Sequence, residues 1–130
     1  MTLLIPVSVG ELIDKITILE IKAQRIDDSI KLANINQELS ALMAVVAEQG
    51  LGYPNGALAD QGHQLASVNL QLWEIEDEIR ECERQACFDA RFIALARSVY
   101  KRNDERARIK RVINAASGSA FVEEKSYSAY

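Results

Sequence analysis

Long stretches without a helix breaker are the feature that most constrains this chain. The 130 residues contain only two prolines, Pro6 and Pro54, and most of the six glycines fall between apolar repeats. Apolar side chains recur every three or four residues, which is the spacing of one face of an α-helix. An alternating strand pattern is absent apart from a short candidate at residues 3–7. The sequence therefore predicts an all-α fold.

Boundary residues divide these repeats into four predicted helices. The first begins after Ser8, a candidate N-cap with Glu11 three residues later. Residues 27–29 interrupt the repeat and cap the second helix, which ends at Gly50. A loop follows, and Asp89 caps the last helix. The apolar repeats run from Leu12 to Ile30, Leu32 to Val46, Leu58 to Cys82 and Phe92 to Ile113. With a lead-in at 1–7 and a docking tail at 117–130, residues 1–130 form a single helical domain.

The predicted helices differ in length. At 1.5 Å per residue the first two span about 27–30 Å and the last two about 40 Å. An antiparallel bundle of two helical hairpins then leaves roughly two turns of apolar seam uncovered on each long helix. Either a symmetric dimer or the tail, through Phe121 and Val122, covers this seam. We expect a homodimer and keep the docked tail as the alternative.

Charge is divided unevenly along the last two predicted helices. The whole chain has a net charge of −4. Residues 74–84 hold six acids and two arginines, whereas residues 91–111 hold eight basic and two acidic side chains. An antiparallel hairpin places the acidic stretch beside the first part of the basic stretch. Such exposed pairs set the orientation of two helices more than they stabilise them.

The far end of the basic stretch has no acid opposite it in this register. Its basic side chains are Arg106, Arg108, Lys110 and Arg111, and residues 63–68 opposite contain His63. They either form a solvated face, pair with acids of the first helix, or bind an anion such as phosphate, a nucleotide or a carboxylate. The acids in reach on the first helix are Glu11, Asp14 and Glu20. A nucleic-acid groove is not expected, because the patch is short and lacks interleaved aromatic side chains.

A polar stripe runs along the third helix beside its apolar seam. It consists of Asn69, Trp73, Glu76, Asp77 and Arg80, and in the hairpin register it approaches Tyr100, Asn103 and Asp104. These residues form either a hydrogen-bond network that fixes helix pairing, or a polar pocket with Trp73 as one wall. In a pocket, a carboxylate would act as an acid, a base or a metal ligand. The candidate carboxylates are Glu76, Asp77 and Asp104.

Composition excludes several kinds of site and location. Two cysteines and one histidine cannot build a zinc site from Cys and His ligands alone, and no Gly-rich phosphate loop is present. Cys82 and Cys87 are predicted to be reduced thiols. The first residues lack a basic signal region, and no stretch approaches the ~20 apolar residues of a membrane span. We therefore expect a cytoplasmic protein with no metal, no cofactor and no membrane span.

Four stretches resemble an uncharacterised family of small bacterial proteins. They are SVGELIDKITILEIK at 8–22, LWEIEDEIR at 72–80, ARSVYKRND at 96–104 and EEKSY at 123–127. The resemblance covers nearly the whole chain and implies a bacterial, cytoplasmic, all-helical protein. It also implies a link to surface-polysaccharide synthesis, since some members of the family lie near genes for that process. It carries over no activity and no catalytic residue.

These observations favour a self-associating helical module that binds a partner protein or an anionic small ligand. The alternative is a small enzyme acting on a phosphorylated or nucleotide-sugar substrate. In that alternative the acid–base groups are Glu76, Asp77 or Asp104, and the anion-holding groups are Arg97, Arg106 and Lys110. An enzyme needs such groups to converge on one concave site, whereas a module needs them only to satisfy one another.

Overall fold

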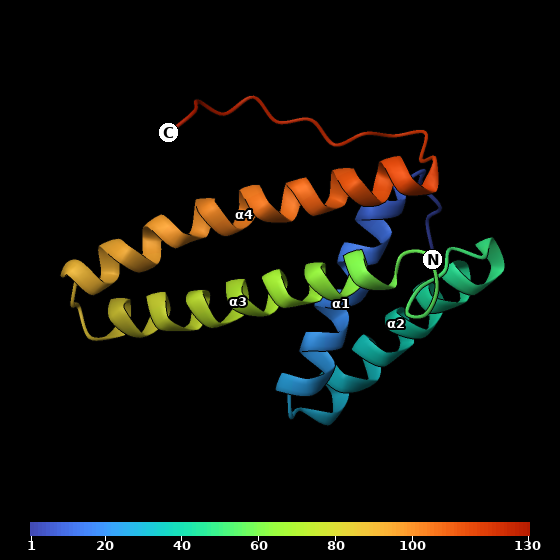
Figure 1. The fold of residues 1–130 in the computed structure, drawn as a ribbon. Coiled ribbons are helices and arrows are strands. Elements are labelled where there is room, and N and C mark those ends of the chain that lie inside the picture. Colours follow the sequence, from blue (N-terminus) through green and yellow to red (C-terminus); the bar gives the residue numbers. More distant parts are fainter.

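The computed structural model describes all 130 residues and contains four helices and no strand (Figure 1). The helices are α1 (Val9–Arg25), α2 (Ser29–Gln49), α3 (Ala59–Arg84) and α4 (Ala90–Ser117). The predicted all-α fold is confirmed. Residues 3–7 do not form the short strand considered above, since no other segment of the chain is a strand that could pair with them. None of the four helices has the length and apolarity that crossing a membrane requires.

Local capping determines where the helices begin and end. Ser8, Asp28 and Asp89 cap α1, α2 and α4, and each side chain accepts a hydrogen bond from a first-turn N–H at 3.1, 2.9 and 3.1 Å. Gly50 and Gly118 end α2 and α4 with φ of 60° and 66°, a left-handed conformation that glycine adopts without a steric penalty. The sequence predicts these caps, but it places Ile30 in the apolar repeat of the first helix, whereas α1 ends at Arg25 and Ile30 is an exposed residue of α2.

Helix α1 is the centre of the fold. It packs against each of the other three helices, whereas α2 packs against α1 alone. Helices α3 and α4 form a long antiparallel hairpin, and α1 crosses this hairpin near one end (Figure 1). The fold is thus a bundle of two helical hairpins, as predicted, in which the shorter hairpin crosses the longer one.

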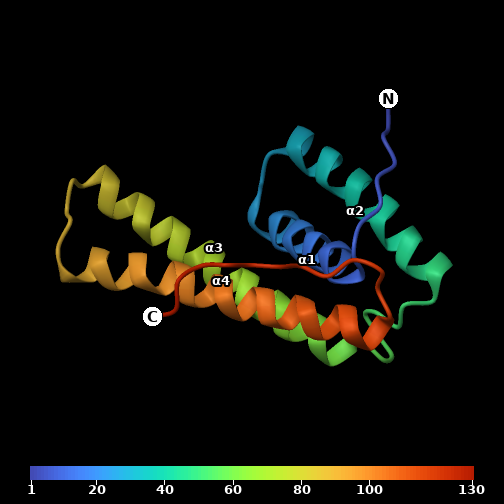
Figure 2. The same cartoon turned by 90° about the horizontal axis from the view of Figure 1, so that it is seen from above.

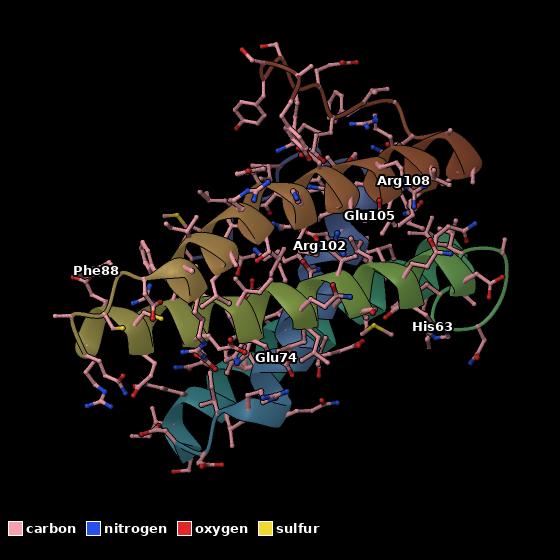
Figure 3. The ribbon with its side chains drawn as sticks, turned by 60° about the vertical axis from the view of Figure 1, so that its left-hand side comes forward. His63, Glu74, Phe88, Arg102, Glu105 and Arg108 are labelled. Atoms are coloured by element: carbon pink, nitrogen blue, oxygen red, sulfur yellow. The ribbon has the colours of Figure 1, made fainter.

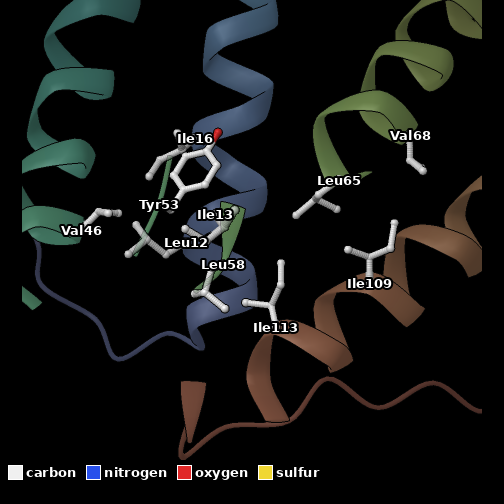
Figure 4. Packing of buried hydrophobic residues seen from close by; sticks show 10 residues of the cluster. All are labelled: Leu12, Ile13, Ile16, Val46, Tyr53, Leu58, Leu65, Val68, Ile109 and Ile113. Atoms are coloured by element: carbon white, nitrogen blue, oxygen red, sulfur yellow. The ribbon is translucent and has the colours of Figure 1, made fainter. Parts of the chain in front are cut away.

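The hydrophobic core lies where α1 crosses α3 and α4 (Figure 4). Burial of such aliphatic side chains stabilises a fold by roughly 1.5–3 kcal/mol each. Ile13, Ile16, Leu65 and Ile113 are completely buried. The ten residues of the core cluster are Leu12, Ile13, Ile16, Val46, Tyr53, Leu58, Leu65, Val68, Ile109 and Ile113. This end of the molecule therefore holds the four helices together.

The other end of the α3–α4 hairpin projects beyond α1 and α2 (Figure 2). We call its residues 79–96 the arm. Within the arm only Cys82 is buried. Phe88 and Ile93 are 53% and 56% exposed, and Phe92 is half-buried against the ring of Phe88. The arm therefore presents apolar side chains that nothing in this chain covers.

The C-terminal tail, residues 118–130, runs along α4 (Figure 1). Glu123 pairs with Lys110 at 2.8 Å, and Tyr130 Oη donates to Asp104 Oδ2 at 2.6 Å. Phe121 and Val122, the residues expected to dock the tail, are instead 48% and 59% exposed. Polar and tyrosine side chains make the contacts because the facing stretch of α4 is itself polar. The contacts lie on residues 100–110, so they do not cover the arm.

Candidate functional site

A buried carboxylate lies where α1 meets α3 and α4. Asp14 is 1% exposed, and its Oδ1 accepts a hydrogen bond from Asn69 Nδ2 at 2.9 Å. Arg106 donates to both oxygens of Asp14, from Nε to Oδ1 at 2.8 Å and from Nη2 to Oδ2. Asn69 Nδ2 also donates to Thr17 Oγ1 at 2.9 Å. The hydrogen bond to Asp14 raises the pKa of Arg106, which is therefore a permanent cation held in one orientation.

A cavity of about 450 Å³ opens beside this network, and we call it the junction cavity. Helix α1 contributes Ile18 and Ile21 to its wall. Seven of the predicted site residues line it, namely Asn69, Trp73, Glu76, Asp77 and Arg80 from α3 and Asn103 and Arg106 from α4. The polar stripe of α3 and the facing residues of α4 therefore converge on one concave surface.

Some polar groups of the junction cavity already have hydrogen-bond or ion-pair partners within the chain, and others do not. Arg80 pairs with Glu76 at 3.3 Å, and both side chains are more than half exposed. Arg106 uses Nε and Nη2 for Asp14 and has no partner at Nη1. The side chains of Asp77 and Asn103 make no hydrogen bond or ion pair within the chain. The cavity thus offers free donors, one free carboxylate and the apolar ring of Trp73.

A smaller cavity of about 170 Å³ shares Asn103 and Arg106 with the junction cavity. Its buried cation is Lys110, whose Nζ lies 2.7 Å from Glu11 Oε2 and 2.8 Å from Glu123 Oε2. Burial lowers the pKa of Lys110, but the contacts with Glu11 and Glu123 and the nearby charge of Asp14 together outweigh burial, and the pKa is raised overall. Lys110 is therefore charged, and it ties α1 and the tail to α4.

The structure revises the predicted basic end of α4. Arg106 and Lys110 pair with acids of α1, which is one of the alternatives left open by the sequence. Arg108 pairs with Glu105 one turn earlier, and the two lie next to each other on α4 while His63 lies near the start of α3 (Figure 3). Glu11 and Asp14 are two of the three acids of the first helix that the sequence places in reach of this basic end. Arg111 alone has no acidic partner.

The remaining predicted residues lie elsewhere. Tyr100 and Asp104 line a third cavity, between α4 and the tail. Asp104 there accepts the hydrogen bond of Tyr130, which raises the pKa of that tyrosine. Arg97 lines none of the three cavities and is exposed. No group of three or more His, Cys, Asp or Glu side chains is placed to hold a metal ion.

Sequence reasoning missed two parts of the site. Asp14 was considered only as an ion-pair partner, although a carboxylate and Thr17 lie within an otherwise apolar repeat of α1. A polar pair on a buried face signals a buried hydrogen-bond network, because buried polar groups need partners. Glu123 and Lys125 of the tail line the smaller cavity, and no local pattern signalled their position.

A comparison with known protein families shows which family the chain belongs to. The model of a family described as a family of unknown function, DUF6165, matches residues 3–130. The chain belongs to this family. Neither the curated proteins nor the solved structures include a match. The DUF6165 match confirms the uncharacterised family that the four sequence stretches resemble, and it includes all three cavities and the tail.

Proposed function

We propose that this protein is a self-associating helical module that binds a small anionic ligand in the junction cavity. Arg106 is the observation that carries this proposal. Its guanidinium is fixed by two hydrogen bonds to the buried Asp14, which leaves Nη1 free, and the unpartnered amide of Asn103 lines the same cavity. A phosphate or carboxylate group can accept hydrogen bonds from both. Because Arg106 is already ordered, binding costs little additional side-chain entropy.

The other residues of the junction cavity suggest which chemical groups the ligand has besides its anionic group. Asp77 is a free carboxylate that repels a second anionic group but accepts hydrogen bonds from hydroxyl or amino groups. Trp73 supplies an apolar wall against which a ring can pack. A phosphorylated sugar combines these features. A bacterial cytoplasmic setting linked to surface-polysaccharide synthesis, which the family resemblance implies, would supply ligands of this kind and forms part of the proposal.

Trp73, the only tryptophan, makes ligand binding directly measurable. We expect its fluorescence to change on titration with sugar phosphates, inorganic phosphate or small carboxylates at up to millimolar concentration. Asn103→Ala should weaken binding about tenfold, since a hydrogen bond to a charged group contributes about 1.5–3 kcal/mol. Asn36→Ala, on the exposed side of α2, is the matched control and should bind as the wild type does. No response to any of these ligands, or equal affinity for both variants, would contradict the proposal.

The second candidate function is the enzyme, and the free carboxylate of Asp77 is the observation that favours it. A general acid or base must lie in the binding cavity and be free to exchange a proton. If Asp77→Asn binds the ligand but loses a turnover that the wild type shows, the protein is an enzyme. If the wild type binds the ligand without converting it, the protein is a binding module.

The arm supports the self-association part of the proposal. Its exposed Phe88 and Ile93 give it an apolar surface, and the stretches of α3 and α4 that lead into it carry opposite charge. Residues 74–84 of α3 hold six acids and two arginines, whereas residues 91–102 of α4 hold four basic side chains and no acid. In an antiparallel pair of arms related by twofold symmetry, α3 of each copy lies against α4 of the other. Opposite charges then face each other across the apolar contact.

A single substitution in the arm tests this dimer. At micromolar concentration, light scattering should give twice the chain mass of 14.5 kDa for the wild type. Ile93→Glu should give the single-chain mass, because a buried carboxylate would cost more than the contact contributes. Ile30→Glu on α2, where the side chain is 74% exposed, should remain dimeric. A wild type that scatters as a single chain would refute the dimer.

A further inference from the structure

A third cavity, with a volume of about 1070 Å³, lies between α4 and the C-terminal tail. The path of the tail along α4 is visible in Figure 1. We call it the tail cavity. Its main polar and aromatic lining residues are Tyr100, Asn103 and Arg111 from α4 and Lys125, Tyr127 and Tyr130 from the tail. It is distinct from the junction cavity, with which it shares Val99 and Asn103.

Two cations, Arg111 and Lys125, and one acid, Asp104, line the tail cavity. Arg111 makes no ion pair, and Lys125 Nζ makes only a long ion pair with Glu123 Oε1, at 3.9 Å. Glu123 is itself committed to Lys110 at 2.8 Å. The one acid in the cavity wall, Asp104, already accepts the Tyr130 hydroxyl. Arg111 and Lys125 against Asp104 leave the lining of the tail cavity with one net positive charge, which suits an anion.

Three tyrosines surround the same space. Tyr100 and Tyr130 meet edge to face with centroids 5.1 Å apart, and Lys125 Nζ lies 5.5 Å from the centroid of the Tyr127 ring. Tyr127 and Tyr130 are 79% and 77% exposed, so much of the surface of their rings is open to a ligand. Aromatic side chains with free faces bind planar rings by stacking, with little dependence on which base is bound.

We infer that the tail cavity is a second ligand site and that it takes a nucleoside phosphate. Arg111 and Lys125 bind the phosphate, and the base stacks on the tyrosines. The tail completes the site because it supplies Lys125 and two of the three rings. The ion pair between the buried Lys110 and Glu123 and the Tyr130–Asp104 hydrogen bond hold the tail in this position. The tail is therefore held against α4 by polar contacts, and its position there completes the tail cavity.

Isothermal titration of the full chain with AMP tests this inference. Arg111→Gln should weaken AMP binding about tenfold, because it removes a charged donor to the phosphate. Arg108→Gln is the matched control: Arg108 pairs with Glu105, lines none of the three cavities and should leave binding unchanged. Tyr127→Ala should also weaken AMP binding about tenfold through lost stacking. Adenosine and inorganic phosphate should each bind more weakly than AMP.

A second readout follows the tail itself. Bound AMP should slow trypsin cleavage after Lys125 in the wild type and in Arg108→Gln, but not in Arg111→Gln at the same AMP concentration. Absence of AMP binding would overturn the inference, as would equal affinity of Arg111→Gln and Arg108→Gln. Phosphate binding that is as tight as that of AMP and that Arg111→Gln weakens equally would overturn the assignment of a nucleoside. None of these results depends on Trp73, which reports on the junction cavity alone.

Discussion

Arg106→Ala is expected to lower the free energy of unfolding by about 3–5 kcal/mol, the cost of leaving one partner of a buried ion pair alone. Asp14 is 1% exposed, and Arg106 donates to both of its oxygens. Without the guanidinium, Asn69 would remain as the only side chain donating to this carboxylate. An uncompensated charge would then be buried at the crossing of three helices.

Urea unfolding of two arginine variants measures this effect. Arg108→Ala is the control, since Arg108 and Glu105 form an exposed pair one turn apart on α4 and should contribute less than about 0.5 kcal/mol. A double variant that also carries Asp14→Ala should recover part of the loss, because the buried charge is then gone. A loss below about 1 kcal/mol in Arg106→Ala would show that Asp14 does not depend on this ion pair.

Gly10→Ala is expected to destabilise the fold by about 1–3 kcal/mol, the usual cost of overpacking. A Cβ at residue 10 would lie 2.7 Å from the Lys110 carbonyl oxygen and 2.8 Å from Asn114 Oδ1. Asn114 is 2% exposed and accepts a hydrogen bond from the Gly10 N–H at 2.7 Å, so it cannot move away without losing that bond. Helix α1 would have to separate from α4.

Helix propensity alone predicts that Gly10→Ala would not lower the free energy of unfolding. Alanine is favoured over glycine within a helix by about 1 kcal/mol, so an unpacked Gly10→Ala would be neutral or stabilising. Ala33→Gly, at an exposed position of α2, measures this propensity difference in the same protein and should cost about 1 kcal/mol. Stabilisation in Gly10→Ala, measured by urea unfolding, would contradict the close approach of α1 and α4.

Much of the helical structure could be predicted because its signals are local. Ser8, Asp28 and Asp89 cap their helices with bonds to residues two or three positions ahead, and Gly50 needs only its own backbone conformation. The exposed seam at the far end of the long hairpin also followed from helix lengths. These features depend on neighbours within one or two turns.

The candidate site was predictable only in part. The residues of α3 and α4 that line the junction cavity share a helical stripe and a hairpin register, both of which can be read from spacing. Asp104 and Tyr100 fell in the same register but lie on the side of α4 that faces the tail. Register gives the level of a residue along the hairpin. It does not give the side of the helix that a third element will cover.

The sequence by itself determined four helices, the caps at most of their ends, the uneven charge and the polar stripe, because each depends on residues near one another in the chain. The tertiary structure alone decided what these groups do. Asp14 lies 92 residues from Arg106, and Gly10 lies 104 residues from Asn114. Such partners meet only because burial of the core brings α1 across α4. Because α1 crosses α4 there, Arg106 at the basic end of α4 pairs with Asp14 and is held beside the junction cavity.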